Sequence, residues 1–457
     1  MFGLQATAES EGRGSRQLLC KGLQVSMTKR ILWLLALAFM LASTAGSRAD
    51  LAAYLAKPEP VYKWEKRNEL KIAGGTAYDI HLVSQTWQSL VWEHRLVLFV
   101  PDKTKYTHFC TLFNTGGDGG KPSDNALILA AAKSSGAPFA VLYNIPKQPL
   151  YGGKVEDALV VYTWQKYLET GDESWPLHFP MAKSVIKAMD ALQEFTKSAN
   201  LPILNDFVIS GASKRGWTTW LVGASKDPRV KGIAPMVIDT LNLTAQIPHQ
   251  IAAFGGASEQ IADYSATGML QALNTPKGKS LMGLEDPYSY RDILTLPKLI
   301  ILGTNDRYWA QDALNYYWDG LKGPKWVLYN PNVGHGLGNE EEHIRVFDTL
   351  GAFSRAIASR SKFPTPVWSY AKSGTDLDLT VTSKAKIVSA SLWQVQSATQ
   401  DFRDSKWAGT PIESKAGGFK AHITAPTSGY SAAYADIVYD DNGAKYHITT
   451  QLQILHK

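Results

Sequence analysis

Hydrophobic residues between positions 50 and 362 occur in short continuous runs that are separated by stretches with helical spacing. The runs predict strands at Arg95–Val100, Phe109–Phe113, Phe139–Ile145, Asp206–Ser210, Gly232–Ile238, Lys298–Leu302 and Lys325–Tyr329. The stretches between them predict helices that include Asn125–Ser134, Val155–Thr170, Pro180–Ser198 and Arg215–Ala224. Apolar strands alternating with helices are typical of a mostly parallel sheet with helices on both faces. Residues 50–362 are therefore predicted to form an α/β domain.

One long segment interrupts this alternation. Residues 240–296 lie between two predicted strands and combine helical and loop character. Long insertions of this kind often cover an active site. We therefore expect residues 240–296 to form a lid-like insertion in the α/β domain.

The pattern changes after Pro364-Thr-Pro366, where apolar and polar residues begin to alternate. Turn residues separate the alternating stretches, which predict strands at Asp376–Ser383, Lys386–Gln394, Gly418–Ala425, Ser431–Asp440 and Lys445–Leu455. Short antiparallel strands in this number are typical of a β-sandwich. Residues 363–457 are therefore predicted to form a small immunoglobulin-like β-sandwich domain.

The residue pattern near the N-terminus indicates a targeting segment. Met27-Thr-Lys-Arg30 precedes a run of twelve apolar residues, Ile31 to Ala42, and small residues follow as far as Ala49. This order predicts a secretory signal peptide over residues 27–49 with cleavage after Ala49, and residues 1–26 are expected to be a non-structural extension. The apolar run is shorter than the roughly 20 residues that a membrane span needs. The alternative is an N-terminal anchor that is not removed. We expect export to the periplasm or secretion, without a stable membrane anchor.

Composition and charge restrict the partners. The chain has 457 residues, of which 45% are hydrophobic and 19% charged, as in packed globular proteins. Residues 1–49 hold six basic and two acidic groups, so the formal net charge of +6 falls to +2 beyond them. We find no cluster of Lys and Arg that would indicate nucleic acid or an anionic membrane as a partner.

Sequence motifs for cofactors are missing as well. Cys110 is the only cysteine beyond the predicted signal peptide, which excludes an intramolecular disulfide and a cysteine-based metal site. We find no H-E-x-x-H motif, and the glycine-rich loop after Phe113 carries neither G-K-[ST] nor G-x-G-x-x-G. The sequence therefore predicts neither a metal nor another cofactor, and a small-molecule ester or peptide is the expected partner.

A serine stands where a strand turns sharply into a helix. The apolar run from Asp206 enters Gly211-Ala212-Ser213-Lys214-Arg215-Gly216 and continues with helical spacing. This is the context of the nucleophile elbow of α/β-hydrolases, where small residues surround a strained serine. Arg215 stands where the usual G-x-S-x-G pattern has its second glycine. The segment predicts that Ser213 is a nucleophile.

An acid and a histidine follow Ser213 in the chain order of α/β-hydrolases. Asp306 follows the predicted strand Lys298–Leu302, and His335 follows the strand Lys325–Tyr329. Catalytic groups of a parallel sheet lie at the carboxyl ends of its strands. We therefore predict a catalytic triad of Ser213, His335 and Asp306. Asp239 also ends a strand and is the alternative acid of the triad, although a capping role is favoured.

Backbone N–H groups are expected to bind the oxyanion of an acyl-transfer reaction. The N–H of Lys214 is one candidate, and Gly117 or Asp118, in a glycine-rich loop after an early strand, is the other. Trp309 and Arg215 are weaker candidates for substrate binding, and Arg215 either selects anionic acyl groups or closes the site. Glu93-His94 comes too early for the triad order, and we predict a hydrogen-bonded structural pair.

Several short motifs are spread over nearly all of the chain beyond residue 50. They are Ser84-Gln-Thr-Trp87 with Trp92 and His94, Thr115-Gly-Gly117, Glu156-Asp-Ala158, Tyr162-Thr-Trp164, Trp175-Pro-Leu177, Met181, Ala188-Met-Asp190, Gly211-Ala-Ser-Lys-Arg-Gly-Trp217, Gly303-Thr-Asn-Asp306 and Asp401-Phe-Arg403. Together they resemble the PhoPQ-activated pathogenicity-related protein family. The resemblance implies an α/β-hydrolase fold and the placement of the serine, and it implies no substrate.

Two functions are therefore open. The first is an exported serine hydrolase that cleaves an ester or a peptide bond, with an ester favoured. The second is a secreted binding or signalling protein on a hydrolase scaffold, associated with virulence or growth regulation. The intact order of serine, acid and histidine favours the enzyme.

Overall fold

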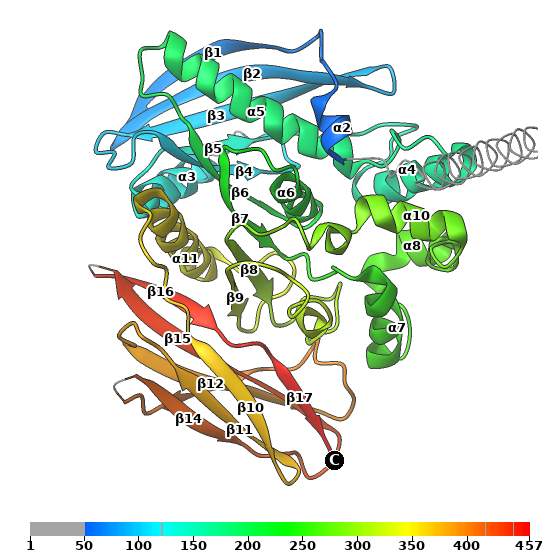
Figure 1. Ribbon diagram of the computed structural model, residues 1–457, viewed down its shortest axis with the longest axis vertical. Helices are drawn as coiled ribbons and strands as arrows, with labels where there is room; N and C mark the ends of the chain where they lie inside the picture. Colours follow the sequence, from blue (N-terminus) through cyan, green and yellow to red (C-terminus); the bar gives the residue numbers. More distant parts are fainter. Residues whose placement is uncertain (1–50, 120–121, 416, 442) are drawn as a thin grey trace, which may run out of the picture. The chain divides into compact units, whose positions relative to one another are not determined.

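The computed structural model describes residues 51–119, 122–415, 417–441 and 443–457 (Figure 1). The predicted signal peptide, residues 27–49, and the extension before it lie outside the described residues. Both stay predictions.

Six parallel strands form the centre of a 14-stranded sheet. They lie in the order β5-β4-β6-β7-β8-β9. Their bounds are β4 (Phe109–Asn114), β5 (Phe139–Leu142), β6 (Asp206–Ala212), β7 (Val230–Met236), β8 (Lys298–Gly303) and β9 (Lys325–Asn330). The interior positions of β4, β5, β6 and β8 are almost all buried, which explains the continuous apolar runs in the sequence.

The strand order reverses between β4 and β6. From β4 the chain moves outward to β5, and it then returns across β4 to β6 and continues in the other direction. The carboxyl ends at such a reversal form a crevice in which α/β proteins bind ligands. The loop after β4 and the turn after β6 meet at this crevice, so the topology places Gly117 and Ser213 at the same edge of the sheet.

Helices cover both faces of the sheet, as predicted (Figure 1). Helices α3 (Pro122–Ser135) and α11 (Glu340–Ser359) pack against each other, and α5 (His178–Ser198) packs against α6 (Lys214–Ala224). Helix α4 (Glu156–Thr170) contacts the insertion. The mostly parallel sheet, its strand order and the helices on both faces confirm the predicted α/β-hydrolase fold.

Antiparallel strands precede the parallel ones. They are β1 (Lys63–Ile72), β2 (Gly75–Trp87) and β3 (Leu90–Pro101), and β3 pairs with β5 in antiparallel orientation. Only the end of this unit was predicted, as Arg95–Val100. Strand β1 exposes nearly all its side chains and therefore lacks an apolar run. The predicted strand Gly232–Ile238 lies two residues too late, because β7 ends at Met236 and Val237 has a φ of 42°.

The insertion between β7 and β8 is mainly helical. Its helices are α7 (Leu243–Phe254), α8 (Ala262–Ala266), α9 (Met269–Ala272) and α10 (Pro276–Glu285), and they lie together at one side of the sheet (Figure 1). The carboxylate of buried Asp286 accepts hydrogen bonds from the backbone N–H groups of Asn242 (3.2 Å), Leu243 (2.9 Å) and Tyr288 (2.9 Å). These bonds tie the start of the insertion to its end.

The C-terminal strands are all antiparallel and form two sheets, as a β-sandwich requires. One sheet has β10 (Val367–Ser373), β11 (Asp376–Thr382) and β14 (Gly418–Ile423). The other has β12 (Ser389–Ser397), β13 (Ala408–Ile412), β15 (Tyr430–Asp441), β16 (Ala444–Thr449) and β17 (Gln453–His456). The sequence did not predict β10 and β13, whose side chains are mostly exposed.

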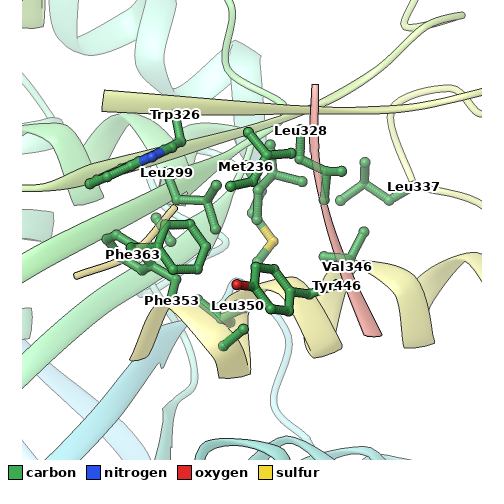
Figure 2. Close-up of a cluster of buried hydrophobic side chains, with 14 of the residues drawn as sticks. Met236, Leu299, Trp326, Leu328, Leu337, Val346, Leu350, Phe353, Phe363 and Tyr446 are labelled. Carbon is green, nitrogen blue, oxygen red and sulfur yellow. The ribbon is translucent and has the colours of Figure 1, made fainter. Parts of the chain in front are cut away.

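The second of these sheets continues the central sheet. Thr449 of β16 pairs with Val327 of β9, and the Thr449 hydroxyl donates to the Val327 carbonyl at 3.1 Å. Figure 2 shows that Tyr446 of β16 packs among side chains of the parallel strands and α11, Met236 and Leu350 included. Strands on both sides of the predicted boundary at 362/363 therefore share one hydrophobic core.

Candidate active site

Ser213 occupies a sharp turn between β6 and α6. Its φ of 58° and ψ of −128° are unusual for a residue with a Cβ atom. A Cβ at Gly211 would lie 2.5 Å from Asn114 Nδ2, and one at Gly216 would lie 2.7 Å from the Met236 carbonyl oxygen. Both glycines are therefore required for the close packing of this turn. The geometry is that of the predicted nucleophile elbow.

His335 and Asp306 form a hydrogen-bonded pair after adjacent strands β9 and β8. His335 Nδ1 lies 2.8 Å from Asp306 Oδ2. Because a carboxylate only accepts hydrogen bonds, Nδ1 carries the proton in this pair, and in the neutral ring Nε2 is then the basic nitrogen. His335 Nε2 is buried and has no hydrogen-bond partner. Asp306 therefore favours the tautomer of His335 whose Nε2 can accept a proton.

Tyr308 connects this pair to the pocket that contains Ser213. Its ring centroid lies 4.3 Å from that of His335, and Tyr308 lines the same pocket as Ser213. The backbone N–H of Tyr308 donates to Asp306 Oδ1 at 2.9 Å. Burial, with the charge of Asp157, raises the pKa of the Tyr308 hydroxyl, which therefore stays protonated. No sequence motif indicated this position of Tyr308.

Asp157, at the start of α4, accepts three side-chain hydrogen bonds. Lys214 Nζ (2.9 Å) and the Tyr308 hydroxyl (3.1 Å) donate to Oδ2, and the Tyr264 hydroxyl donates to Oδ1 at 3.1 Å. We call these four residues the Asp157 network. The network joins α4, α6, the loop after β8 and helix α8 of the insertion. Sequence reasoning placed Asp157 only within the Glu156-Asp-Ala motif and assigned it no role.

Arg215 has a structural position. Its guanidinium is buried, donates two hydrogen bonds of 2.7 Å to Glu156 and a third to the Ile145 carbonyl oxygen. Burial would raise the pKa of Glu156, but the bonds from Arg215 outweigh it and lower the pKa to about 2. Arg215 does not line the pocket of Ser213. The predicted role of Arg215 in substrate binding is therefore not supported by the geometry, because its donors face Glu156 and the main chain.

The pocket beside Ser213 is enclosed by residues of the insertion, α4, α6 and the loop after β8. Its volume is about 60 Å³. Trp309 lies in its wall, where the sequence predicted a cleft residue. The described residues that line it are Asp157, Trp164, Ser213, Lys214, Trp217, Ile238, Thr240, Leu243, Gln246, Ile247, Gln250, Ile261, Tyr264, Leu270, Leu273, Tyr308, Trp309 and Ala310.

The candidate oxyanion donors lie in different surroundings. Lys214 begins α6, whose first N–H groups lack intrahelical acceptors, and it lines the pocket of Ser213. Gly117 and Asp118 line a second cavity, which also contains Tyr143. The Gly117 carbonyl accepts a 2.9 Å hydrogen bond from the Asn144 N–H. The structure therefore brings Lys214 into the pocket of Ser213 and places Gly117 and Asp118 in the wall of another cavity.

The alternative acid, Asp239, is not bonded to His335. Burial raises the pKa of Asp239 well above its usual value, and the charge of Asp306 raises it further. Burial therefore favours the neutral form of Asp239, and a neutral carboxyl group stabilises an imidazolium less than a carboxylate does. The geometry favours Asp306 as the partner of His335.

Glu93 and His94 do not form the predicted pair. His94 is buried, with Nε2 2.8 Å from Ser84 Oγ and Nδ1 3.0 Å from the Asn144 carbonyl oxygen, whereas Glu93 contacts His81. Neighbouring residues of a strand point to opposite faces, so the two side chains are separated by the sheet. Each has a structural role with a different partner.

Within the described part of the chain, no group of three or more His, Cys, Asp or Glu side chains has the arrangement of a metal site. Across the same residues, no helix has the length and apolar character needed to cross a membrane. Cys110 is buried in β4, and burial raises the pKa of its thiol.

The chain is similar to several known proteins. Over 354 residues the chain is 35% identical to autocrine proliferation repressor protein A of Dictyostelium discoideum, with 74% of this chain and 70% of that protein covered. Acetyl xylan esterase 1 from Thermoanaerobacterium is similar over 68% of this chain and 94% of its own, with 13% identity and a TM-score of 0.48. Glucuronoyl esterase from Solibacter usitatus is similar over 69% and 92%, with 14% identity and a TM-score of 0.40.

A family profile also matches most of the chain. Residues 51–403, which include the elbow, the acid, the histidine and the first part of the C-terminal strands, match the profile described as PhoPQ-activated pathogenicity-related protein. The motifs noted in the sequence fall within this range. The chain therefore belongs to the PhoPQ-activated pathogenicity-related protein family.

Proposed function

We propose that the protein is a serine hydrolase that cleaves an ester bond, with Ser213 as nucleophile, His335 as general base and Asp306 as its orienting acid. The observation that carries the proposal is the orientation of His335. Its Nδ1 is bonded to Asp306 and its Nε2 has no partner, while Tyr308 contacts the ring and lines the pocket of Ser213. A histidine with a basic nitrogen and a serine in a strained turn are the two groups that nucleophilic catalysis requires.

The proposed reaction has two steps. Ser213 Oγ attacks the ester carbonyl carbon while His335 Nε2 takes the hydroxyl proton, and the alcohol leaves with that proton as the acyl-enzyme forms. Water then attacks the acyl carbonyl carbon and gives a proton to His335 Nε2. As the bond from the acyl carbon to Ser213 Oγ breaks, His335 returns this proton to Oγ, and the acid leaves. The N–H of Lys214 donates to the oxyanion in both steps, and an N–H of the loop at Gly117 or Asp118 is the second proposed donor. A peptide bond is the alternative substrate.

Labelling with a fluorophosphonate probe tests the nucleophile. We expect stoichiometric labelling of the purified protein, peptide mapping to Ser213 and loss of labelling in Ser213→Ala. Ser280→Ala is the matched control, because Ser280 is exposed on α10 and outside the pocket. A protein that unfolds cooperatively but is not labelled, or labelling that persists in Ser213→Ala, would overturn the proposal.

A second candidate function is signalling by recognition. It is favoured by the relative that is named an autocrine proliferation repressor. If this chain acts on cell growth in the same sense without catalysis, Ser213→Ala retains the effect on proliferating cells. Loss of the effect in Ser213→Ala, with the fold intact, favours the enzyme.

We also propose that the protein is exported. The predicted signal peptide over residues 27–49 supports this proposal. Expression of the full chain in a bacterium should yield a periplasmic or secreted form whose N-terminal sequence begins at Asp50. Retention of residues 27–49 in the membrane fraction would support the uncleaved anchor instead.

A further inference from the structure

We propose that the pocket beside Ser213 binds a short, uncharged acyl group, and that Asp157 excludes anionic acyl groups by neutralising Lys214. This inference deepens the proposed function, because it names the substrate class of the same site. It rests on the charges and hydrogen bonds of the pocket.

The cation nearest the nucleophile is already paired. Among the described residues that line the pocket, Lys214 is the only one with a positive charge. Its Nζ lies 2.9 Å from Asp157 Oδ2 and 3.3 Å from Glu156 Oε2. The next cation, Arg215, is bonded to Glu156. Two cations thus face two carboxylates, so an anionic acyl group entering the pocket would find no free positive partner.

Other polar side chains of the pocket wall already form hydrogen bonds with the main chain of the protein. Gln246 Nε2 donates to the Ala313 carbonyl at 2.7 Å, and Gln250 Nε2 donates to the Tyr308 carbonyl at 2.5 Å. Thr240 Oγ1 and Trp309 Nε1 are buried without a partner, and both are neutral donors. The polar groups of the wall other than Lys214 and Asp157 are therefore neutral, and none of them adds a positive charge for a carboxylate.

The rest of the wall is apolar. Trp164 and Trp217 come from α4 and α6, and the insertion adds aliphatic side chains, namely Leu243, Ile247, Ile261, Leu270 and Leu273. A bound hydrocarbon chain would be stabilised by removing its surface from water. The volume of about 60 Å³ is small beside the roughly 300–1,000 Å³ of ordinary ligand pockets, which favours a short acyl chain over a long one.

Asp157 is the residue that sets this preference. It lies in the pocket wall and directly contacts Lys214. The substitution Asp157→Asn keeps the size of the side chain and one oxygen acceptor for Lys214 and Tyr308, but removes the charge. Lys214 would then have only the more distant Glu156 as a partner, and a carboxylate on the acyl group would gain a cation.

The experiment compares neutral and anionic esters of the same leaving group: p-nitrophenyl acetate, butyrate and octanoate, and mono-p-nitrophenyl succinate. For the wild type we expect the highest kcat/KM with butyrate and a value lower by about a hundredfold with succinate, because the carboxylate is desolvated without a partner. In Asp157→Asn the ratio of succinate to butyrate should rise by about tenfold or more.

Two controls separate charge from other effects. Asp263→Asn removes an exposed carboxylate from the same insertion, outside the pocket, and should leave the ratio unchanged. Adding Lys214→Met to Asp157→Asn removes the freed cation but keeps the backbone N–H, and should abolish the gain. A wild type that prefers succinate, or an unchanged ratio in a folded Asp157→Asn that still hydrolyses butyrate, would overturn the inference.

A binding measurement separates this inference from the proposed function. Trp164, Trp217 and Trp309 line the pocket, so tryptophan fluorescence reports its occupation. Ser213→Ala should bind butyramide more tightly than succinamate, and Ser213→Ala with Asp157→Asn should reverse or reduce the difference. If no ester is hydrolysed but this binding preference holds, the proposed function fails and the inference stands. If neither amide binds, or the preference is reversed, the inference fails.

Discussion

The ring of Tyr308 lies 4.3 Å from the ring of His335, with 36° between the two planes. The same tyrosine bonds through its hydroxyl to Asp157, and its backbone N–H donates to Asp306. Tyr308 therefore contacts the histidine, its acid and the network that reaches the insertion. In the proposed mechanism Tyr308 is a positioning residue, which holds the imidazole of His335 in place through the ring contact.

Two substitutions separate the ring of Tyr308 from its hydroxyl. Tyr308→Phe keeps the packing against His335 and should lower kcat for butyrate ester hydrolysis only a few fold, whereas Tyr308→Ala should lower it by about a hundredfold, because small misplacements of catalytic groups are costly. Steady-state kinetics over a range of pH checks this. An equal loss in both variants would show that the bond to Asp157, not the ring contact, is what matters.

The acid of the triad is tested by a matched pair of isosteric changes. Asp306→Asn should lower kcat by about a thousandfold or more, because an amide no longer fixes the tautomer in which His335 Nε2 is basic. Asp239→Asn should stay within about twofold of the wild type, because Asp239 is not bonded to His335 and its burial favours the neutral carboxyl group. If the large loss falls on Asp239→Asn instead, the assignment of the acid is wrong.

The positions of the three candidate triad residues in the fold could be predicted from the sequence. Ser213, Asp306 and His335 each follow an apolar strand, so period and chain order were sufficient to place them at one edge of the sheet. The α/β fold was predictable for the same reason, since its parallel strands are buried on both faces. Strand β1 was not, because its side chains are exposed and charged.

The local pattern of residue types does not predict contacts between segments that are far apart along the chain. Asp157 bonds to Tyr264 and Tyr308, more than 100 residues away along the chain. Arg215 was predicted to bind substrate because it is adjacent to the elbow in the sequence. In the structure its guanidinium donates to Glu156 instead. The pairing of β16 with β9 also joins segments separated by more than 100 residues. Only the tertiary structure decides these partners.

The close approach of Arg215 to the loop after β4 predicts that Gly116 is essential for stability. A Cβ at Gly116 would lie 1.8 Å from Arg215 Nη2, so Gly116→Ala must displace a buried guanidinium that is bonded to Glu156. We expect the free energy of unfolding to fall by about 2 kcal/mol or more, as for other overpacked sites. Urea unfolding of the wild type and of Gly116→Ala measures this change in the free energy of unfolding.

Gly256→Ala is the control for this change, because no heavy atom lies within 4 Å of a Cβ at Gly256. It should alter the free energy of unfolding by no more than about 0.5 kcal/mol. Equal stability of Gly116→Ala and Gly256→Ala would mean that Arg215 moves aside at no cost, and that its bonds to Glu156 do not stabilise the fold.

Buried His94 predicts how stability depends on pH. Burial lowers the pKa of His94 to about 4, from the usual value of 6.5. Between these two values the unfolded chain binds more protons than the folded protein, so this group makes the free energy of unfolding rise with pH from about 4 to 6.5. The stabilisation is fully present above pH 6.5 and is lost on acidification, with an upper limit of about 3 kcal/mol for a shift of this size.

His94→Gln removes the titrating group from this position. The variant should be less stable than the wild type at pH 7, because the bonds of His94 to Ser84 Oγ and the Asn144 carbonyl are changed. The difference between the two should shrink as the pH falls toward 4.5, since only the wild type loses stability through this histidine. Urea unfolding at several pH values between 4.5 and 7.5 measures it. A constant difference across this range would mean that His94 titrates alike in the folded and unfolded states, and that its burial does not hold it neutral.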